Sequence, residues 1–441
     1  MNLSIEQLQG IFSKLGVIRF LAKPLAENDN SKQQIYLGGS FDVLNDIPFQ
    51  EVIADSVAKV PNFKAKLKWN WITENGNFEP APHAQLILYP SYPEVRLSGF
   101  LRGCSSSPSE QMRPIPFGRR GPKNSWDGRV LLMGIRGDGE IFAALSSAGS
   151  IASSQFEELR TSKAIDKNGA LYSLPIAYEA PTKSNDTKHE LLLELIRIKG
   201  MGWIPSARIQ KDGRIKPYQA SNGGGYTLEA MLGIAPNGRS EPDFLGWELK
   251  AYSGSRITLM TPEPNVGLYG EKGVAEFLRS YGYLREDDTL YFTGIHKVGI
   301  RHEKTNQLLS LEGFDANSEK ILNPDGGIYL SDNNGNLSAA WSYAGLISHW
   351  GRKHANVAYV AYEKQNDEFS EYKYLSPVLL GIGTSFTRFL TAMAKGDVVY
   401  DPAPKMTNAS SDKPRTKARS QFRITTKKLY TLYQTFESEV I

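Results

Sequence analysis

The chain has 441 residues, of which 40% are apolar and 11% aromatic, and its formal net charge is +4. This length exceeds one ordinary hydrophobic core and predicts about two or three domains. No apolar run approaches the roughly 18 residues that a membrane span needs, and the N-terminus lacks a signal-peptide pattern. The single cysteine, Cys104, excludes an internal disulfide or a zinc cluster. We therefore expect a soluble, cytoplasmic protein with no membrane partner.

Residues 1–165 show short apolar runs separated by turn signals. The runs are QQIYLGG (33–39), AQLILYP (84–90), EVRLSGF (94–100), RVLLMGI (129–135) and EIFAAL (140–145). A Gly-Asp-Gly turn signal at 137–139 separates the last two runs. Strand-length runs at this spacing predict an all-β barrel or sandwich.

The pattern changes after a connecting segment that we expect at 166–188. Within it, SLPIAYEAPTKSNDTK (173–188) is polar and contains two prolines. The next segment, HELLLELIRIKG (189–200), has helical apolar spacing and ends at a glycine. Further helices are expected at 271–283, 338–353 and 377–395, and strands at 289–295, 327–331, 356–362 and 397–401. These mixed elements predict, for residues 189–441, an α/β domain with a mixed sheet flanked by helices.

Basic residues gather in two separate segments of this nearly balanced chain. Between Arg96 and Arg136, eight basic residues are opposed only by Glu110 and Asp127. The second segment, KPRTKARSQFRITTKK (413–428), contains no acidic residue. Two such segments suggest two surfaces for a polyanion, and the alternative is a pair of solvated loops.

The stretch EPDFLGWELKAY (241–252) is mostly apolar, yet it contains Asp243, Glu248 and Lys250. Alternation along a strand places Glu248 and Lys250 on one face, and Gly246 lets the chain bend so that Asp243 can approach Glu248. Two converging carboxylates form a hard-oxygen site suited to Mg²⁺, and a lysine beside them can orient a water molecule. The alternative is a surface salt bridge on a hairpin.

The preceding segment GGGYTLEAMLGI (223–234) predicts a flexible glycine entry into a short helix with Thr227 as its N-cap. Glu229 lies near the start of this helix and could face the same site. Together with PDFLGWELK (242–250), this segment resembles the MvaI/BcnI group of restriction endonucleases and, more distantly, the mismatch-repair nicking enzyme MutH. The resemblance covers roughly residues 189–441 and implies the PD-(D/E)xK nuclease fold.

The resemblance also implies roles for the matched residues. Asp243, Glu248 and the backbone carbonyl of Leu249 would bind the divalent cation, Mg²⁺, and Lys250 would position the attacking water. Glu229 would support the metal site or assist proton transfer. Direct attack by water would leave 5′-phosphate and 3′-hydroxyl ends.

The segment DPAPKMTNASSDKPRTKARSQFRI (401–424) resembles the part of these endonucleases that reads the major groove. Arginine pairs with guanine, and aspartate accepts a hydrogen bond from the cytosine amino group. The candidate base contacts are Arg419 and Arg423 for guanine, Asp401 for cytosine, and Gln421 for adenine or a phosphate. If this segment is extended, Phe422 points into the core. The alternative for some of Lys413, Arg415 and Lys417 is to neutralise phosphates, a role that we favour for most of the lysines.

In the first half, YPSYPEVRLSGFLRGC (89–104) resembles the N-terminal effector domain of EcoRII, a DNA-binding pseudobarrel related to plant B-three domains. That fold grips the major groove with two arms, which here would lie near 30–40 and 96–123. The candidate contacts are Lys32, Gln34 and Tyr36 in the first arm, and Arg96, Arg102, Arg113, Arg119 and Lys123 in the second. The alternative for Arg96 is a structural salt bridge with Glu94.

Relatives of both halves recognise 5′-CCWGG, where W is A or T, so the two resemblances imply one target. We predict a Mg²⁺-dependent type II restriction endonuclease of double-stranded DNA, with an effector domain and a cognate DNA methyltransferase as its genetic partner. It would act as a monomer or as two chains on a palindrome. The alternatives are a MutH-like strand-nicking repair endonuclease and a DNA-binding regulator with an inactive nuclease half. The intact set of Asp243, Glu248 and Lys250 argues against the regulator.

Overall fold

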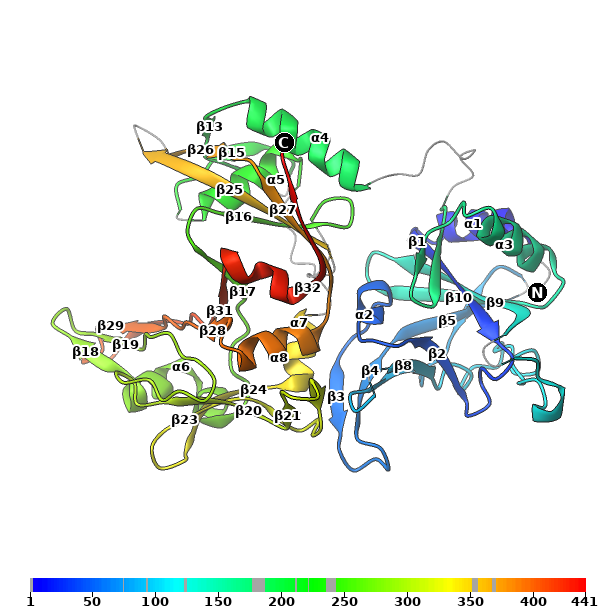
Figure 1. The fold of residues 1–441 in the computed structure, drawn as a ribbon, viewed down its shortest axis with the longest axis horizontal. Helices are drawn as coiled ribbons and strands as arrows, with labels where there is room; N and C mark the ends of the chain where they lie inside the picture. The colour runs from blue at the N-terminus through cyan, green and yellow to red at the C-terminus, as the bar shows by residue number, and fades with distance from the viewer. Residues whose placement is uncertain are drawn as a thin grey trace. The chain divides into compact units, whose positions relative to one another are not determined.

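The structure is a computed structural model that describes residues 3–73, 75–92, 94–122, 125–176, 187–210, 212–220, 222–234, 243–350, 356–366 and 370–441. The chain divides into two compact units, Met1–Ser184 and Asn185–Ile441 (Figure 1). None of the helices in the described part of the chain combines the length and apolarity that crossing a membrane requires.

The first unit contains two sheets. The seven-stranded sheet has the order β11 (Lys167–Asn168), β12 (Leu171–Leu174), β1 (Val17–Ala26), β9 (Trp126–Arg136), β10 (Glu140–Ser146), β5 (Lys68–Ile72) and β6 (Phe78–Pro80). The five-stranded sheet has the order β2 (Gln34–Gly38), β8 (Glu94–Ser98), β7 (Gln85–Tyr89), β4 (Asn62–Lys66) and β3 (Val52–Asp55). All pairs are antiparallel except β10 with β5. The five strands expected from the sequence are confirmed as β2, β7, β8, β9 and β10.

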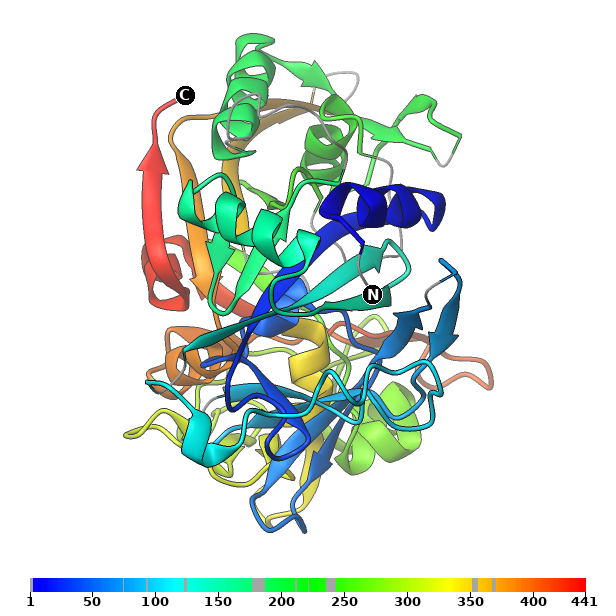
Figure 2. The same ribbon diagram turned by 90° about the vertical axis from the view of Figure 1, so that its right-hand side faces the viewer.

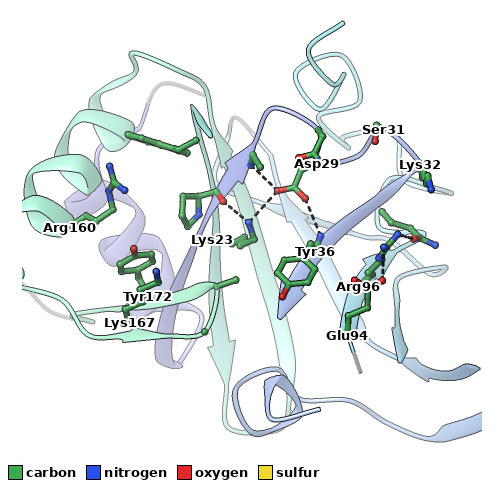
Figure 3. Close-up of a pocket in the computed structure, with 17 residues that line it drawn as sticks. Lys23, Asp29, Ser31, Lys32, Tyr36, Glu94, Arg96, Arg160, Lys167 and Tyr172 are labelled. Atoms are coloured by element: carbon green, nitrogen blue, oxygen red, sulfur yellow. Dashed lines mark hydrogen bonds and ion pairs between the residues drawn. The ribbon is translucent and has the colours of Figure 1, made fainter. Parts of the chain in front are cut away.

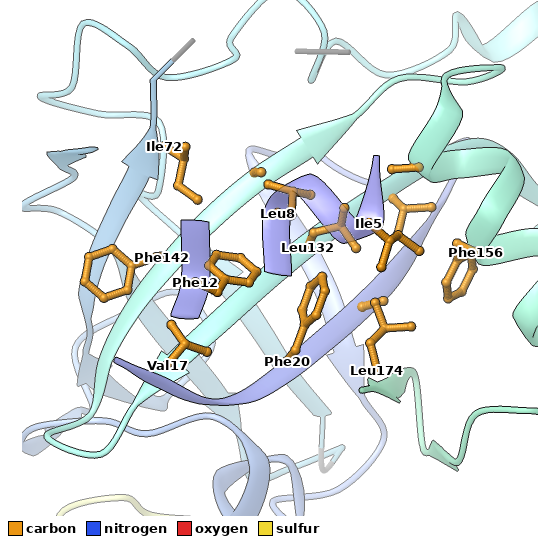
Figure 4. Packing of buried hydrophobic residues seen from close by; sticks show 14 of the residues in the cluster. Ile5, Leu8, Phe12, Val17, Phe20, Ile72, Leu132, Phe142, Phe156 and Leu174 are labelled. Atoms are coloured by element: carbon orange, nitrogen blue, oxygen red, sulfur yellow. The ribbon is translucent and has the colours of Figure 1, made fainter. Parts of the chain in front are cut away.

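Helices α1 (Ile5–Lys14) and α3 (Ile151–Thr161) lie side by side against the seven-stranded sheet, so this unit is largely rather than wholly β (Figures 1 and 2). A capping box starts α1, because the Ser4 hydroxyl accepts from the backbone N–H of Gln7, whose side chain accepts from the backbone N–H of Ser4. Phe12 and Phe20 pack edge to face at 4.9 Å in the core beneath these helices (Figure 4). The shorter elements of this unit are α2 (Val43–Asp46) and the 3-10 turn η1 (Phe117–Arg119).

The first sheet extends into the range that the sequence suggested as a connection. Strand β12 pairs with β1, and β11 pairs with β12. Leu171 and Leu174 are buried in the sheet, which explains why this segment folds back onto the unit. The expected connection at 166–188 therefore contains two strands, and its residues 177–186 lie outside the described part.

The second unit is built on a mixed sheet. Its order is β13 (Ile204–Pro205), β26 (Ser370–Tyr374), β25 (Asn356–Asn366), β27 (Val378–Thr384) and β32 (Tyr433–Glu439), and β16 (Glu248–Tyr252) pairs with β25. The β16–β25 pair is parallel, and its neighbours are antiparallel. Helices α4 (Thr187–Gly200) and α5 (Gly223–Met231) cover one face, where Leu195 and Leu228 pack on Leu249 and Leu380.

Smaller sheets complete this unit. They are β17 (Arg256–Met260), β31 (Phe422–Thr425) and β28 (Val398–Tyr400); β18 (Tyr283–Arg285), β19 (Thr289–Tyr291), β29 (Lys405–Thr407) and β30 (Arg415–Lys417); β20 (Leu308–Glu312), β23 (Gly327–Ser331) and β24 (Leu337–Ser342); and the pairs β14 (Ala207–Ile209) with β15 (Ile215–Pro217) and β21 (Phe314–Asp315) with β22 (Lys320–Ile321). The remaining helices are α6 (Gly267–Tyr281), α7 (Tyr343–Trp350), α8 (Phe386–Ala394) and the 3-10 helix η2 (Thr426–Leu432).

Two of the expected helices are partly wrong. The first part of 338–353 is strand β24, and the first part of 377–395 is strand β27. Both strands are apolar enough to resemble the start of a buried helix, but both pair with a neighbouring strand. The second helix begins only after Ser385, whose hydroxyl accepts from the backbone N–H of Arg388 as an N-cap.

Candidate active site and nucleic-acid interface

A tight turn brings Asp243 back beside the start of β16. Leu245 and Gly246 have φ angles of 49° and 86°, and two positive φ angles in succession are typical of a type I′ hairpin turn. Phe244 and Trp247 flank the turn and exchange both backbone hydrogen bonds, at 2.9 and 2.7 Å. The spacing of four residues between Asp243 and Glu248 therefore matches this hairpin, which consists of two flanking residues and two turn residues. Pro242, the preceding residue of the expected motif, lies outside the described residues.

Asp243 occupies the outer edge of β16. Its Oδ2 accepts a hydrogen bond from the backbone N–H of Leu249 at 2.9 Å. Among the described strands, β16 pairs only with β25, which lies on its other side. Because the N–H and C=O of one strand residue point the same way within the sheet, the Leu249 carbonyl is directed to the edge that carries the Asp243 carboxylate.

Glu248 and Lys250 share the face opposite the Leu249 side chain, as strand alternation predicted. Glu248 is only 6% exposed, and the Lys250 Nζ lies 3.5 Å from its Oε1. Trp247 and Leu249 pack into the core beneath α4 and α5 on the other face. A carboxylate this well buried requires a compensating charge nearby, and Lys250 supplies one.

The donor set of this hairpin fits a hard divalent cation. Two carboxylates, Asp243 and Glu248, and the Leu249 carbonyl are oxygen donors of the kind that Mg²⁺ prefers. Among the residues that the structure describes, no group of three or more His, Cys, Asp or Glu side chains is arranged to hold a metal ion. A cation here would therefore rely on these two carboxylates, the main-chain carbonyl, water and substrate oxygens.

Two buried tyrosines lie on the same face as Glu248 and Lys250. The parallel register aligns Lys250 with Tyr359, whose hydroxyl lies 2.6 Å from that of Tyr433. The Tyr433 ring covers Gly381, where a Cβ atom would come within 2.5 Å of the ring. Burial, followed by the charge of Glu248, raises the pKa of Tyr359. Burial, Tyr359 and then Glu248 raise the pKa of Tyr433, so both phenols stay protonated.

Glu229 lies in the last turn of helix α5 and not, as the sequence suggested, near its start. The helix begins at Gly223 after Asn222, so the expected N-cap role of Thr227 is wrong. Thr227 is buried inside the helix, where its Oγ1 accepts from the backbone N–H of Ala207 at 3.0 Å. Glu229 contributes, after burial and two tyrosines, to raising the pKa of Tyr374, which belongs to the core cluster on the face away from Glu248.

The glycines before Glu229 serve close packing rather than a flexible entry. A Cβ atom on Gly223 would come within 2.4 Å of the Tyr372 hydroxyl oxygen, and one on Gly224 within 2.5 Å of the Tyr362 ring. Helix α5 can approach the sheet closely only because these two positions lack side chains.

In the C-terminal segment, two candidate base-reading residues form an ion pair. The Arg423 guanidinium lies 2.7 Å from the Asp401 carboxylate, and both side chains are partly exposed. The backbone holds the two together, because Asp401 N–H donates to Gln421 O and Ala403 N–H donates to Arg419 O, both at 2.9 Å. The structure therefore presents an arginine and a carboxylate as one unit.

The neighbouring candidates differ in exposure. Gln421 is buried, its amide donates to Asp401 O at 3.1 Å, and its Oε1 accepts from Thr258 Oγ1 at 3.3 Å. Phe422 is fully buried, which confirms the expected anchor. Arg419 is exposed, and so are Arg415 and Lys417 on β30.

In the first unit, four candidate contacts line one cavity of about 760 Å³. These residues are Lys32, Gln34, Tyr36 and Arg96, from strand β2, its preceding loop and β8 (Figure 3). Arg96 donates to Gln34 Oε1 at 3.0 Å and forms an ion pair with Glu94 at 2.5 Å. The pairing with Glu94 that the sequence left open as the alternative for Arg96 is present, and both side chains line the cavity wall.

A buried ion pair holds the chain segment that carries Lys32 and Tyr36. Asp29 Oδ2 accepts from the Lys23 ammonium at 3.2 Å and from the Ala26 backbone at 2.9 Å, and Oδ1 accepts from the Tyr36 backbone at 3.1 Å (Figure 3). Both charged side chains are 6% exposed. Asp29 thus ties the two ends of residues 26–36 together, and this segment includes Lys32 and Tyr36 of the expected first arm.

The opposite wall of this cavity carries cationic and aromatic residues that sequence reasoning missed. The Arg160 guanidinium lies 5.0 Å from the Trp126 ring centroid, and the Lys167 ammonium lies 5.7 Å from that of Tyr172. The sequence places Lys167 and Tyr172 in the expected connection at 166–188, and it gave no prediction for Arg160. The signal that could have identified these cations is an aromatic ring beside each of them. That signal is absent from the sequence, because Arg160 and Trp126, like Lys167 and Tyr172, meet only in the folded unit.

The remaining candidates of the second arm lie elsewhere. Arg113 is exposed and paired with Glu110 at 2.7 Å, and Arg119 is exposed on η1. Arg102 lines a second cavity of about 580 Å³. Lys123 lies outside the described residues. Of the second-arm candidates described, Arg96 is the one that joins the first-arm residues at the first cavity.

Comparison with known proteins gives one family. The model of the MvaI/BcnI restriction endonuclease family matches residues 192–433, more than half of the chain. A solved complex of the restriction endonuclease MvaI with a cognate DNA substrate is 21% identical, has a TM-score of 0.43, and covers 58% of this chain and 99% of its own. MvaI without DNA is 18% identical, with a TM-score of 0.32 and coverages of 59% and 99%. No curated protein matches the chain.

Proposed function

This chain belongs to the MvaI/BcnI restriction endonuclease family, and from this we propose that its second unit hydrolyses phosphodiester bonds of double-stranded DNA at the hairpin 243–250. We further propose that this unit has the PD-(D/E)xK fold and leaves 5′-phosphate ends. One observation carries the proposal. A single two-residue turn sets the Asp243 carboxylate at the strand edge, beside the Leu249 main chain and next to the Glu248–Lys250 pair.

Each residue of this hairpin has a role that follows from its position. Asp243, Glu248 and the Leu249 carbonyl would hold Mg²⁺, which when bound supplies Lewis-acid activation of a water and of the phosphate. Lys250 would orient the attacking water and offset the negative charge that builds on the phosphate. Glu248 keeps the Lys250 ammonium directed to the site. Glu229 has the more distant role of support, consistent with its place beside Tyr374.

Specificity would come from an arginine and a carboxylate acting together. A G·C pair displays the guanine acceptors O6 and N7 beside the cytosine amino donor in the major groove. Arg423 and Asp401 offer the complementary groups within one ion pair. Arg419 is a further guanine candidate, and the exposed Arg415 and Lys417 suit phosphates. We propose 5′-CCWGG as the target, on the strength of the resemblance of both halves.

The first unit would bind the same DNA through its first cavity. Arg96 and Glu94 form a second arginine–carboxylate pair there, beside Lys32, Gln34 and Tyr36 of the first arm. Cations on the opposite wall, Arg160 and Lys167, would neutralise phosphates. This arrangement supports the proposal of a DNA-binding pseudobarrel of the effector type.

The experiment is cleavage of a supercoiled plasmid with CCWGG sites by the purified chain, with Mg²⁺ or with EDTA. We expect cleavage only with Mg²⁺, and a loss of roughly a hundred- to a thousandfold in rate for Asp243→Asn and Lys250→Met, the magnitude of single-residue electrostatic contributions to catalysis. The matched controls are Asp287→Asn and Lys272→Met, two exposed positions of the same unit that should cut normally. Normal cutting by Asp243→Asn would remove the active-site assignment.

The products also separate the alternatives. Linear DNA with mapped ends inside CCWGG supports a restriction endonuclease, whereas accumulation of nicked circles supports the MutH-like alternative. Binding without any cutting under every metal tested supports the regulator.

A further inference from the structure

The first arm is the common wall of two cavities. Ser31, Lys32 and Gln34 line the first cavity, whereas Asn30, just before them, and Gln33, between two of them, line the second cavity. The second cavity of about 580 Å³ is closed by three further segments, namely the end of β4, residues 82–85 and residues 98–102. The arm therefore separates two hollows on its two sides.

The charges of the two cavities differ. The carboxylates of the first cavity, Asp29 and Glu94, are already paired with Lys23 and Arg96. The second cavity contains Lys66, His83 and Arg102 and no carboxylate in its lining. Within the described ranges, these three side chains make no ion pair and no hydrogen bond. Unpaired basic side chains around a hollow with no acid attract an anion.

The walls of the second cavity are fixed by close backbone contacts. Gly99 has a φ of 69°, and a Cβ atom there would lie 2.0 Å from the carbonyl oxygen of His83. Trp71 Nε1 donates to the carbonyl of Phe100, the next residue of this turn, at 2.6 Å. The turns that carry His83 and Arg102 are thus locked together, so little ordering is needed when an anion binds.

We propose that this second cavity binds the phosphodiester backbone of the DNA strand that runs beside the first arm. The inference rests on the proposed DNA binding by the first unit. An arm lying in a major groove about 12 Å wide has a sugar-phosphate backbone on each side. The first cavity binds the base edges and one sugar-phosphate backbone. The cations of the second cavity bind the other sugar-phosphate backbone. Such contacts fix the register of the protein on DNA and carry no sequence information.

The test uses the full chain in EDTA, so that DNA is bound but not cut. Fluorescence anisotropy with a CCWGG duplex and a scrambled duplex, at several salt concentrations, compares Lys66→Ala, Arg102→Ala and the double variant with the wild type. Each lost phosphate contact should lower the slope of log affinity against log salt by about 0.9, and the double variant by about twice as much. Both duplexes should weaken by the same factor. Lys14→Ala, an exposed lysine at the end of α1, is the control.

The outcomes separate this inference from the function beneath it. If the Lys66→Ala and Arg102→Ala variants keep the wild-type salt slope while Arg96→Ala loses its preference for CCWGG, the proposal for the second cavity is wrong. DNA binding by the first unit then still stands. No effect of Arg96→Ala, Lys32→Ala or the cavity variants would instead reject DNA binding by that unit. The last measurement is a titration with ATP in the absence of DNA. ATP binding that depends on Lys66, combined with unchanged DNA affinity, would assign the cavity to a free nucleotide and reject the backbone.

Discussion

The hydroxyl oxygens of Tyr359 and Tyr433 lie 2.6 Å apart in the interior of the second unit, on the sheet face that carries Glu248. Only one hydrogen can lie between the two oxygens, so the other hydroxyl hydrogen is available to a different acceptor. Glu248 is the carboxylate whose charge raises the pKa of both phenols. The floor of the candidate active site is therefore a hydrogen-bonded pair.

Replacing one tyrosine of this pair should lower the free energy of unfolding by more than half of the loss caused by replacing both. Tyr359→Phe or Tyr433→Phe leaves a buried hydroxyl without its partner and should lower the free energy of unfolding by about 1–3 kcal/mol. The double variant should lose clearly less than the sum, because two apolar rings then face each other. Urea unfolding of the four proteins measures the coupling. Tyr430→Phe, at an exposed position, is the control, and strictly additive losses would show that the pair is not coupled.

The hairpin turn gives a prediction about backbone conformation. Gly246 has open space around its Cβ position but a φ of 86°, so Gly246→Ala should cost about 1–2 kcal/mol for conformational reasons alone. Cleavage should slow with it, because the turn sets the position of Asp243. Leu245→Asn should be neutral or stabilising, since asparagine tolerates a positive φ better than leucine. Gly254→Ala also enters open space, at a position without a positive φ, and should change neither stability nor rate.

Base reading and phosphate binding can be told apart in the C-terminal segment. Arg423→Ala should relax discrimination at one base pair by about 1–3 kcal/mol, because Arg423 and Asp401 act as one pair. Asp401→Asn should relax the same position. Arg415→Ala should instead weaken all duplexes equally and reduce the salt dependence. Binding of CCWGG and its single-base variants at two salt concentrations by the full chain in EDTA measures both effects. Equal losses on every duplex for Arg423→Ala would assign that residue to the backbone.

Arg419 is tested in the same assay. Arg419 is exposed and does not share the carboxylate partner of Arg423. We therefore expect Arg419→Ala to relax sequence discrimination at a different base pair. A loss shared by all sequences would move it to the phosphate-binding group with Arg415 and Lys417.

A buried histidine predicts a pH dependence of stability. Burial, with the charge of His302, lowers the pKa of His296 from 6.5 to about 4, while Thr305 Oγ1 lies 2.8 Å from its Nε2. Because the unfolded chain takes up a proton near pH 6.5 and the folded chain only near pH 4, stability should fall as the pH drops through this window, by up to about 3 kcal/mol. Urea unfolding at pH 7 and pH 4.5 measures the loss. His296→Gln should show a smaller loss, and an equal loss would contradict a neutral His296.

Local patterns of the sequence predicted much of the architecture. Alternation in the first half predicted β2, β7, β8, β9 and β10, and helical spacing predicted α4. The position of Gly246 predicted the bend that returns Asp243 to β16. Strand alternation predicted that Phe422 points into the core if its segment is extended, and Phe422 is fully buried. These features depend on neighbours in sequence, which a single chain displays directly.

What could not be predicted depends on partners that are distant in sequence. Strand β24 was mistaken for the start of a helix because its pairing with β23, and not its composition, decides its conformation. Thr227 was expected to cap the helix, but it lies inside the helix, where its hydroxyl oxygen accepts from the backbone N–H of Ala207. The salt bridge between Arg423 and Asp401 joins residues brought together only by the sheet β17–β31–β28.

Asp243 also has a consequence for self-association. A strand edge with a free main-chain donor is a template for pairing with another chain, and β16 is such an edge among the described strands. The carboxylate of Asp243 covers that donor at Leu249. Alanine at this position would remove the chemistry and uncover the edge at once, so an inactive Asp243→Ala protein is at risk of aggregating. Asparagine retains an acceptor oxygen for Leu249, and it is therefore the substitution that separates loss of catalysis from exposure of an adhesive edge.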